Sequence, residues 1–363
     1  MKIEDSIRPL ILKQPVYLAG KPIEYVAREF GLDPDNILKM ASNENPLGSS
    51  PKAIEAINSD LLNTLNYYPD GSHYDLSIKL AQKLGLDKEQ IVCGNGSNEI
   101  LETIAKVFLE EGKNSVFGTH SFIVYKIATQ LVGAECKEVE MPNLRYDFDL
   151  LFNAIDENTR VVFLASPNNP TGTLTSQEEL DSFIAKLPEG VILVLDCAYT
   201  EFQDEPLDII KHIKAGKNVI CTQTFSKIYG LAGLRVGYAY TTKEIAKYLE
   251  VARQPFNTNS IAQKAAIAAI DDADFVAKSK AVNDEGMKFL ANFFEEMNLE
   301  YIAEGGNFVM VKLNNALEIF DSMQKLGIIL RPNVGYGLPD WLRITIGKPE
   351  QNARLVQELR KLL

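Results

Sequence analysis

The 363-residue sequence predicts an α/β fold with a mostly parallel sheet and a second, smaller α+β domain. Short, continuously apolar runs alternate with helical patterns up to Tyr240, which is typical of a parallel sheet covered by helices on both faces. After Tyr240 the pattern changes to long helices and then to short strands. The length exceeds that of a usual single domain, which also favours one large domain and a smaller one.

The composition is that of an ordinary globular protein, since 46% of the residues are hydrophobic and 24% are charged. The net charge of −12 argues against nucleic acid or an anionic membrane as a partner, because both need a clustered basic surface. No apolar run is long enough to span a membrane, and the first residues lack the apolar run of a signal peptide. The widely spaced cysteines predict free thiols in a reducing, cytoplasmic setting; they are Cys93, Cys136, Cys197 and Cys221.

The first part of the chain predicts an arm followed by turns and helices. Residues 1–39 contain Pro9, Pro15 and Pro22 and then a short helical segment at 23–30. A polar, asparagine-rich segment follows at 40–48 and is typical of a turn. Helices are expected from Ser50 to about residue 58, where proline occupies the first turn, and from about 73 to 84.

The strands of the main sheet are marked by apolar runs. We expect them at 91–94, 116–117, 137–140, 161–165, 190–195, 218–221 and 236–240. Between them we expect helices from Ser97 to Leu109, from Ser121 to Val132 and after Ser176, where a capping box is completed by Glu179. The C-terminal part should contain helices at 243–254, 260–270 and 273–297, short strands at 308–311, 328–330 and 342–345, and a last helix from residue 351.

A lysine stands where one of these strands ends. Lys227 follows the strand at 218–221 and has Thr224, Ser226 and Arg235 near it in the sequence. Ligands of α/β sheets bind outside the carboxyl ends of the strands. Burial or a neighbouring cation lowers the pKa of a lysine toward the neutral form that a Schiff base requires, and hydroxyls with an arginine suit a phosphate. Together these residues predict a pyridoxal phosphate (PLP) pocket.

A glycine turn between a strand and a helix gives a second candidate. Gly96, Ser97 and Asn98 stand at the start of the expected helix, where free N–H groups and the helix dipole favour an anion. The turn is not a dinucleotide fingerprint, because Glu99 replaces the last glycine of G-x-G-x-x-G. The three histidines have no metal-ligand spacing, so we expect no metal site; they are His73, His120 and His212.

Seven motifs in register resemble one family. They are Asn43-Glu44-Asn45-Pro46, Tyr68-Pro69, Gly96-Ser97-Asn98, Ser166-Pro167-Asn168-Asn169-Pro170-Thr171-Gly172, Asp196 with Tyr199, Thr224-x-x-Lys227 with Arg235, and Leu342-Arg343-Ile344-Thr345. Over essentially its whole length the chain resembles the fold-type I, class II PLP-dependent aminotransferases, and among them the histidinol-phosphate aminotransferases. The resemblance implies a large PLP-binding domain at 40–255 with a mostly parallel sheet of the seven-stranded type. It also implies an arm at 1–39 that joins the small domain, and an interdomain helix with a small C-terminal domain at 256–363.

The resemblance also implies which residues hold PLP. Lys227 would carry the cofactor, Asp196 would pair with its ring nitrogen, and Tyr199 and Asn169 would bond its phenolic oxygen. The phosphate would lie among Gly96, Ser97, Asn98, Thr224, Ser226 and Arg235, and Tyr68 would reach it from the other subunit of a homodimer with shared sites. Phe122 would stack on the ring. Core packing is the alternative for Phe122, a helix cap for Asp196, a half-buried aromatic for Tyr199 and a turn residue for Asn169.

For the substrates, the resemblance implies that Arg343 binds an α-carboxylate and Arg331, ending the strand at 328–330, a phosphate. Tyr17 and Asn45 would line the substrate side chain. The alternative for Arg331 is an exposed residue at a strand end. The implied reaction moves an amino group between glutamate or 2-oxoglutarate and histidinol phosphate or imidazole acetol phosphate in histidine biosynthesis. The rivals are an aromatic amino acid or prephenate aminotransferase, a threonine-phosphate decarboxylase and a non-catalytic PLP-binding protein.

Overall fold

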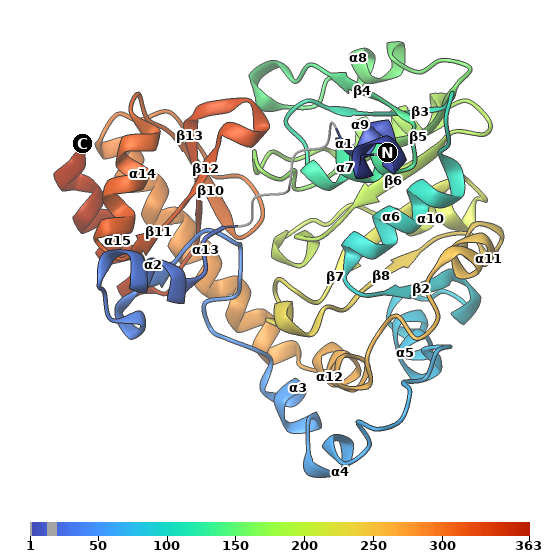
Figure 1. Ribbon diagram of the computed structural model, residues 1–363, viewed down its shortest axis with the longest axis horizontal. Helices are drawn as coiled ribbons and strands as arrows, with labels where there is room; N and C mark the ends of the chain where they lie inside the picture. The colour runs from blue at the N-terminus through green and yellow to red at the C-terminus, as the bar shows by residue number, and fades with distance from the viewer. Residues whose placement is uncertain (1, 13–19) are drawn as a thin grey trace.

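A seven-stranded sheet and a four-stranded sheet lie side by side in the computed structural model, which describes residues 2–12 and 20–363 (Figure 1). The large sheet has the order β2-β8-β7-β6-β5-β3-β4, and the pairs that include β8 are antiparallel whereas the others are parallel. The mostly parallel sheet predicted from the sequence is therefore confirmed. Its strands are β2 (Ile91–Gly94), β3 (Asn114–Gly118), β4 (Glu135–Val139), β5 (Thr159–Ala165), β6 (Ile192–Asp196), β7 (Val219–Thr224) and β8 (Gly237–Tyr240).

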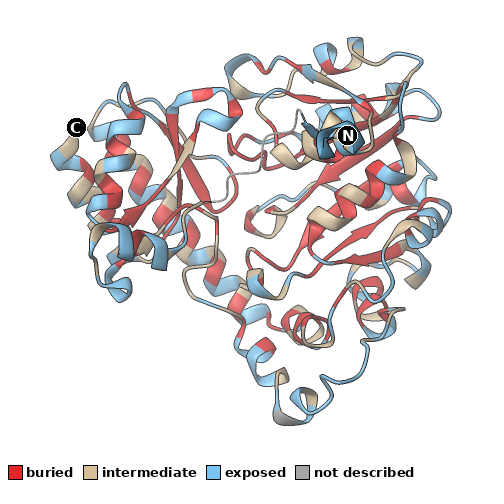
Figure 2. Ribbon diagram, in the orientation of Figure 1, coloured by how far each residue is buried: buried red, intermediate tan, exposed pale blue. Residues whose placement is uncertain are grey.

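Helices cover both faces of this sheet, and its strands are buried except for the edge strand β4, which is partly exposed (Figure 2). One face packs against α6 (Ser97–Phe108), α7 (Ile123–Leu131) and α11 (Lys243–Ala252). The other face packs against α5 (Tyr74–Leu84), α8 (Phe148–Asn153), α9 (Gln177–Lys186), α10 (Ile210–Lys214) and α12 (Ser260–Ile270). The short helices α3 (Pro51–Ala56) and α4 (Ser59–Leu62) lie beside α12. The capping box of α9, between Ser176 and Glu179, forms as predicted.

The small sheet is antiparallel and has the order β12-β13-β10-β9. Its strands are β9 (Tyr301–Ile302), β10 (Phe308–Lys312), β12 (Arg331–Asn333) and β13 (Leu338–Thr345). A separate apolar core under this sheet joins it to α13 (Ala273–Glu296), α14 (Ala316–Lys325) and α15 (Pro349–Leu362). Helix α13 runs from the large part to the small one (Figure 1): Val276 packs on the large core, while Leu290 belongs to the small one.

The N-terminal segment divides between the two parts. Helix α1 (Pro9–Leu12) lies on α7, where Arg8 Nη1 donates to the carbonyl of Leu131 at 3.1 Å. Helix α2 (Ile23–Phe30) lies with the small part, and β1 (Leu38–Lys39) pairs in parallel with β11 (Ile328–Ile329). The described residues of the arm therefore contact both parts of the molecule.

The expected strand at 328–330 is divided into two strands. Strand β11 ends at Ile329 and pairs with β1, whereas Arg331 begins β12 and pairs with β13. Arg331 therefore starts a strand of the small sheet instead of ending the one before it. Helices α8, α10 and α14 were not predicted. No helix in the described part of the chain combines the length and apolar character needed to cross a membrane.

Candidate active site

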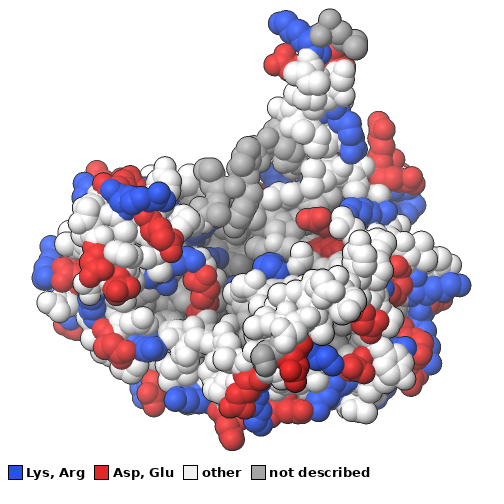
Figure 3. All heavy atoms as spheres, turned by 60° about the horizontal axis from the view of Figure 1, so that its bottom comes forward, with Lys and Arg blue, Asp and Glu red and all other residues white. Residues whose placement is uncertain are grey.

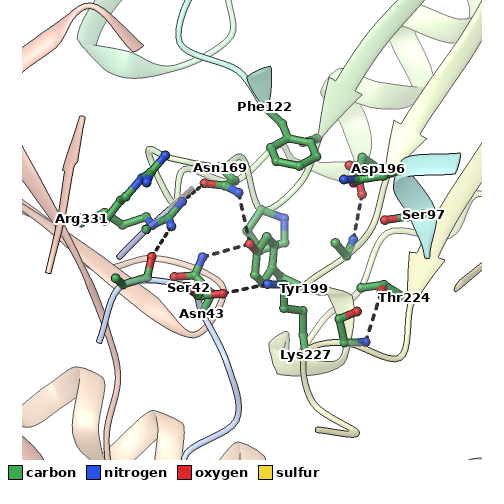
Figure 4. A pocket seen from close by; sticks show the side chains of 18 of the residues that line it. Ser42, Asn43, Ser97, Phe122, Asn169, Asp196, Tyr199, Thr224, Lys227 and Arg331 are labelled. Atoms are coloured by element: carbon green, nitrogen blue, oxygen red, sulfur yellow. Dashed lines mark hydrogen bonds between the residues drawn. The ribbon is translucent and has the colours of Figure 1, made fainter. Parts of the chain in front are cut away.

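Residues from both sheets line a cavity of about 210 Å³. Figure 3 shows the chain hollowed between its two parts, with lysine or arginine atoms inside the hollow. In the close view of Figure 4, Tyr199 lies near the middle of the cavity. Arg331 lies on one side of it, and the other side holds Asp196, Ser97 and Thr224. The carboxyl ends of β5, β6 and β7, the start of α6, residues 41–43 and the small sheet all contribute to the lining.

Lys227 enters the cavity from the loop after β7. Its Nζ donates to the carbonyl of Ser42 at 3.1 Å and lies 5.6 Å from the ring centre of Tyr199. Burial, followed by the Arg343 guanidinium, lowers the pKa of Lys227 to about 8. A substantial fraction of this amine is therefore neutral near pH 7.5, which a nucleophile or a proton acceptor requires.

Asp196 ends β6 and is 5% exposed. The Tyr125 hydroxyl donates to its Oδ2 at 3.1 Å, and the Ala198 N–H donates to its Oδ1 at 3.2 Å. Both donors are neutral, and burial raises the pKa of Asp196 to about 6. A buried carboxylate is costly without a positive partner. Since Asp196 lines the cavity, a cationic ring nitrogen placed there would supply that partner.

Tyr199 is held by two asparagines. Its Oη accepts from Asn43 Nδ2 at 2.9 Å and from Asn169 Nδ2 at 3.2 Å. Asn169 in turn accepts through Oδ1 from Arg343 Nη1, and Arg343 Nη2 donates to the carbonyl of Ala41 at 2.9 Å. Burial raises the pKa of Tyr199 to about 12, so the phenol keeps its proton near neutral pH.

Two arginines face the cavity from the small sheet. Arg331 and Arg343 are directly opposite each other in the register of β12 and β13, and both line the cavity. Arg343 is 6% exposed, and its Nε has no hydrogen-bond partner among the described residues. Like charges in directly opposed positions repel. An anionic ligand between these two side chains would relieve that repulsion.

The start of α6 forms a cradle with Arg235. Gly96 has φ +80° and precedes the first residue of the helix, while a Cβ at Gly96 would collide with the Arg235 guanidinium. A Cβ at Gly237 would likewise collide with the backbone at Ser97. Arg235 Nη1 donates to Ser226 Oγ at 3.3 Å. Glycines that permit this close approach, an arginine and a helix N-terminus together fit a phosphate group.

The cavity brings together most residues that the sequence singled out. Those that line it are Ser97, Asn98, Phe122, Asn169, Asp196, Tyr199, Thr224, Ser226, Lys227, Arg235, Arg331 and Arg343. The Phe122 ring lies edge-on to Tyr125, with 5.8 Å between the ring centres. Gly96 lies behind the lining, where it makes room for Arg235.

Two more of the expected residues do not line the cavity. Tyr68 is 82% exposed and stacks on Phe256, with 4.8 Å between the ring centres. Asn45 does not line the cavity, and its Nδ2 donates to the carbonyl of Ile228 at 2.7 Å and to Ser279 Oγ at 2.9 Å. Tyr17 lies outside the described residues.

Sequence reasoning missed several residues that line the cavity, among them Gly20, Ser42, Asn43, Tyr125 and Tyr336. A signal existed for two of them. Asn43 lies in the asparagine-rich segment read as a turn, and asparagine adopts a positive φ, here +54°, more readily than most residues. Tyr125 follows Phe122 by three residues, which is the spacing of neighbours on one helix face.

Comparisons with known proteins agree with this arrangement. The family model described as aminotransferase class I and II matches residues 35–359. A protein named histidinol-phosphate aminotransferase 2 from Pseudomonas aeruginosa is 46% identical over 359 residues, which cover 98% of this chain and 97% of the relative. A histidinol-phosphate aminotransferase from Akkermansia muciniphila is 45% identical, with both chains covered completely.

Solved structures resemble the whole chain. The histidinol-phosphate aminotransferase of Sinorhizobium meliloti in complex with pyridoxal-5'-phosphate is 28% identical, has a TM-score of 0.89 and is matched over 98% of both chains. The aspartate aminotransferase of Thermus thermophilus with maleate is 19% identical and has a TM-score of 0.84 over 98% of this chain and 99% of that one. At that identity the second match shows the fold alone.

Proposed function

This chain belongs to the class I and II aminotransferase family, and we propose that it is a PLP-dependent histidinol-phosphate aminotransferase of histidine biosynthesis. The proposed reaction exchanges an amino group between glutamate or 2-oxoglutarate and histidinol phosphate or imidazole acetol phosphate. Relatives with that name cover nearly the whole chain at 45–46% identity. The observation that carries the proposal is the pairing of Arg331 and Arg343 in a cavity that also contains Lys227.

The cavity fits PLP at three places. The cradle of Gly96, Ser97 and Arg235 suits the phosphate, and the buried Asp196 carboxylate suits a protonated ring nitrogen. Phe122, which also lines the cavity, offers an aromatic ring that could stack on the cofactor. PLP, when bound, supplies an aldehyde that condenses with amines and a ring that withdraws electrons from the bond being broken. Asp196 would hold the positive charge of that ring in place.

Lys227 is the residue that we propose to hold the aldehyde and to move the substrate proton. Its lowered pKa, about 8, keeps a fraction of Nζ neutral at neutral pH. Once free of the cofactor, the neutral Lys227 amine would take the proton from the substrate Cα and would deliver it to the carbon that had carried the aldehyde. The carbonyl of Ser42, 3.1 Å from Nζ, orients the amine when it is free.

The substrates differ in their anionic groups, and the two arginines address this difference. We propose that Arg343 forms the bidentate contact to the α-carboxylate of glutamate. We propose that Arg331 contacts the phosphate of histidinol phosphate. Because the two amino-group transfers share one cavity, one substrate leaves before the next binds, and the kinetics should be ping-pong.

A purified-enzyme panel tests the proposed function. The protein loaded with PLP should transfer the amino group of glutamate to imidazole acetol phosphate with a higher kcat/KM than to phenylpyruvate or prephenate. Release of carbon dioxide from threonine phosphate should not occur. A preference for the aromatic acceptors would replace the proposal with an aromatic or prephenate aminotransferase, and absence of any transfer would contradict catalysis.

We also propose that the enzyme is a cytoplasmic homodimer with shared active sites. Exposed apolar side chains gather on and after the short helices α3 and α4, and Phe256 adds to them; they include Ile54, Leu65, Tyr67 and Tyr68. Such a patch favours contact with another protein surface. A second copy would cover it and bring Tyr68 to the phosphate of the partner's cofactor. The four unpaired cysteines suit a reducing compartment.

Sedimentation and subunit mixing test the shared site. We expect a dimer, and we expect mixed Tyr68→Phe and Lys227→Ala chains to form one hybrid site with both defects and one with neither. The mixture should therefore be more active than the Lys227→Ala enzyme alone. Each intact hybrid site should also be more active than a site of the Tyr68→Phe enzyme. An active monomer would contradict the shared site.

A further inference from the structure

We propose that Asn43 is a positioning residue that fixes the direction of the Tyr199 hydroxyl and thereby sets the proton affinity of the bound cofactor. The inference rests on the proposed function, because it concerns side chains that would face PLP. Asn43 is 1% exposed and comes from the segment that precedes α3, far in sequence from Tyr199. Its side chain donates to the Tyr199 Oη at 2.9 Å.

The surroundings of Asn43 leave its side-chain amide one orientation. The Asn43 N–H donates to Thr345 Oγ1 at 2.9 Å, so the Thr345 proton must point away from that N–H. Thr345 Oγ1 donates this proton to Asn43 Oδ1 at 3.1 Å. Asn307 Nδ2 meanwhile donates to the Asn43 carbonyl at 3.0 Å. With Oδ1 engaged by Thr345, only the amino group of Asn43 can face Tyr199.

A second amide completes the arrangement. Arg343 donates to Asn169 Oδ1, which turns the Asn169 amino group toward Tyr199. The phenolic oxygen therefore accepts two hydrogen bonds, one from each asparagine, and its own proton has no acceptor on either side chain. Tyr199 lines the cavity (Figure 4), so its proton is available to a ligand oxygen there. Tyr199 is thus a dedicated donor.

The donated bonds also make that proton more acidic. A hydrogen bond received by a hydroxyl oxygen polarises its O–H and strengthens the bond that the hydroxyl donates. A donor that faces the phenolic oxygen of PLP stabilises the form of the cofactor with more negative charge on that oxygen, which is the deprotonated form. Loss of the Asn43 amide should therefore raise the pH at which the bound cofactor loses its proton.

The titratable and charged groups near Tyr199 come from five segments of the chain, and a substitution at Asn43 changes none of them. They are Asp196 at the end of β6, Lys227 after β7, Tyr125 on α7, Arg343 on β13 and Tyr336 between β12 and β13. A change caused by Asn43 alone is therefore separable from a change in the charge of the site.

Glycine separates the side chain of Asn43 from its backbone. Asn43 has φ +54°, a conformation that glycine adopts without strain. Asn43→Gly should keep the backbone bonds to Thr345 and Asn307 while it removes the amide. If Asn43 serves only as a turn residue, glycine replaces it without effect on the cofactor. Asn43→Asp keeps the shape but puts an acceptor where the donor was, so it should draw the Tyr199 proton away from the cavity.

The experiment is a pH titration of the visible absorption of the PLP-loaded enzyme. We expect Asn43→Gly to raise the midpoint by about 0.5–1 pH unit, the size of one hydrogen bond. Asn43→Asp should raise it at least as far, and Tyr199→Phe should raise it further. Asn43→Gly should add nothing when Tyr199 is already phenylalanine, because the amide acts through the phenol.

Asn352→Ala is the matched control. Asn352 is also a buried asparagine, and its side chain bonds the backbone of Gly347 at 2.9 Å, away from the cavity. The Asn352→Ala variant should have a lower melting temperature but the same midpoint of the absorption titration as wild type. An unchanged midpoint in Asn43→Gly, or an additive shift in the double variant, would overturn the inference while the proposed function stands. A wild-type protein that acquires no visible band with PLP would overturn both.

Discussion

The two walls of the cavity are built on different principles. On the large-sheet wall, Asp196 and Thr224 end neighbouring parallel strands that are buried on both faces, and neutral donors of the same chain bond the Asp196 carboxylate. On the small-sheet wall, Arg331 and Arg343 oppose each other across two antiparallel strands. The large-sheet wall suits one cofactor that stays bound, whereas the positive charge of the small-sheet wall suits anionic substrates that bind and leave in turn. Reaction type and substrate choice should therefore respond to different substitutions.

The largest expected effect belongs to the large-sheet wall. Lys227→Ala should reduce kcat/KM at least about 10³-fold for every amino donor, since it removes the proposed proton carrier. Borohydride reduction of the loaded wild-type enzyme should attach the cofactor to Lys227, which peptide mapping would locate. The exposed Lys243→Ala is the control and should retain activity. Attachment at a different lysine would contradict the role of this wall.

Asp196→Asn should separate activity from stability. Without the carboxylate a protonated ring loses its partner, and we expect kcat to fall about 10²-fold for all substrates alike. The cofactor-free protein should nevertheless become more stable. Burial raises the folded-state pKa of Asp196 to about 6 from an ordinary 3.8, so the folded protein binds this proton more tightly than the unfolded chain does.

The pH dependence of that stability follows from the same shift. The contribution of Asp196 is most favourable below about pH 4 and is lost as the pH rises through about 6, at a cost on the order of 2–3 kcal/mol. Thermal unfolding of the cofactor-free proteins at pH 4.5 and 7 measures it. Asp196→Asn should raise the melting temperature mainly at pH 7. An equal change at both pH values would show that the ionised carboxylate is not the cause.

The smaller effect belongs to the small-sheet wall and is selective. A phosphate monoester carries close to two negative charges near pH 7, whereas phenylalanine offers Arg331 no comparable group. Arg331→Ala should lower kcat/KM for histidinol phosphate by about 10- to 100-fold and should lower it little for phenylalanine. Glutamate should lose some activity if Arg331 also contacts its side-chain carboxylate. The exposed Arg360→Ala is the control.

The ratio of the two kcat/KM values is the quantity that decides between substrates. If that ratio is the same in wild type and Arg331→Ala, then Arg331 does not contact a phosphate, and the aromatic aminotransferase alternative gains support. If Lys227→Ala changed the ratio as well, the separation of the two walls would be wrong.

The large-sheet wall was the more predictable one because its geometry is local. Lys227 and Arg235 lie within one strand–loop–strand unit, so the spacing of residues in the sequence already indicated that they share a site. The small-sheet wall depends on contacts between distant segments. Asn43 and Thr345 are separated by 302 positions, and no periodic pattern relates them.

The strand pairing of the small sheet could not be predicted from the sequence either. The apolar run at 328–330 was read as one strand, but the chain passes from β11 to β12 at Leu330 because each strand pairs with a different partner. The sequence prediction placed Asn45 at the site, whereas it is Asn43 whose side chain contacts Tyr199. Both residues belong to the same polar turn, and only the positive φ of Asn43 distinguishes them. Backbone angles of this kind follow from tertiary contacts.

The position of β8 between β2 and β7 has a consequence for synthesis of the chain on the ribosome. Strand β2 ends at Gly94, but β8, its neighbour in the sheet, begins only at Gly237. At about 5–20 residues per second, the roughly 140 residues between them take on the order of ten seconds to add. Strands β3 to β7 can pair with one another during that interval, while β2 has no neighbouring strand to pair with. A nascent chain stalled before Gly237 should therefore bind chaperones through β2, and release should follow once β8 has emerged.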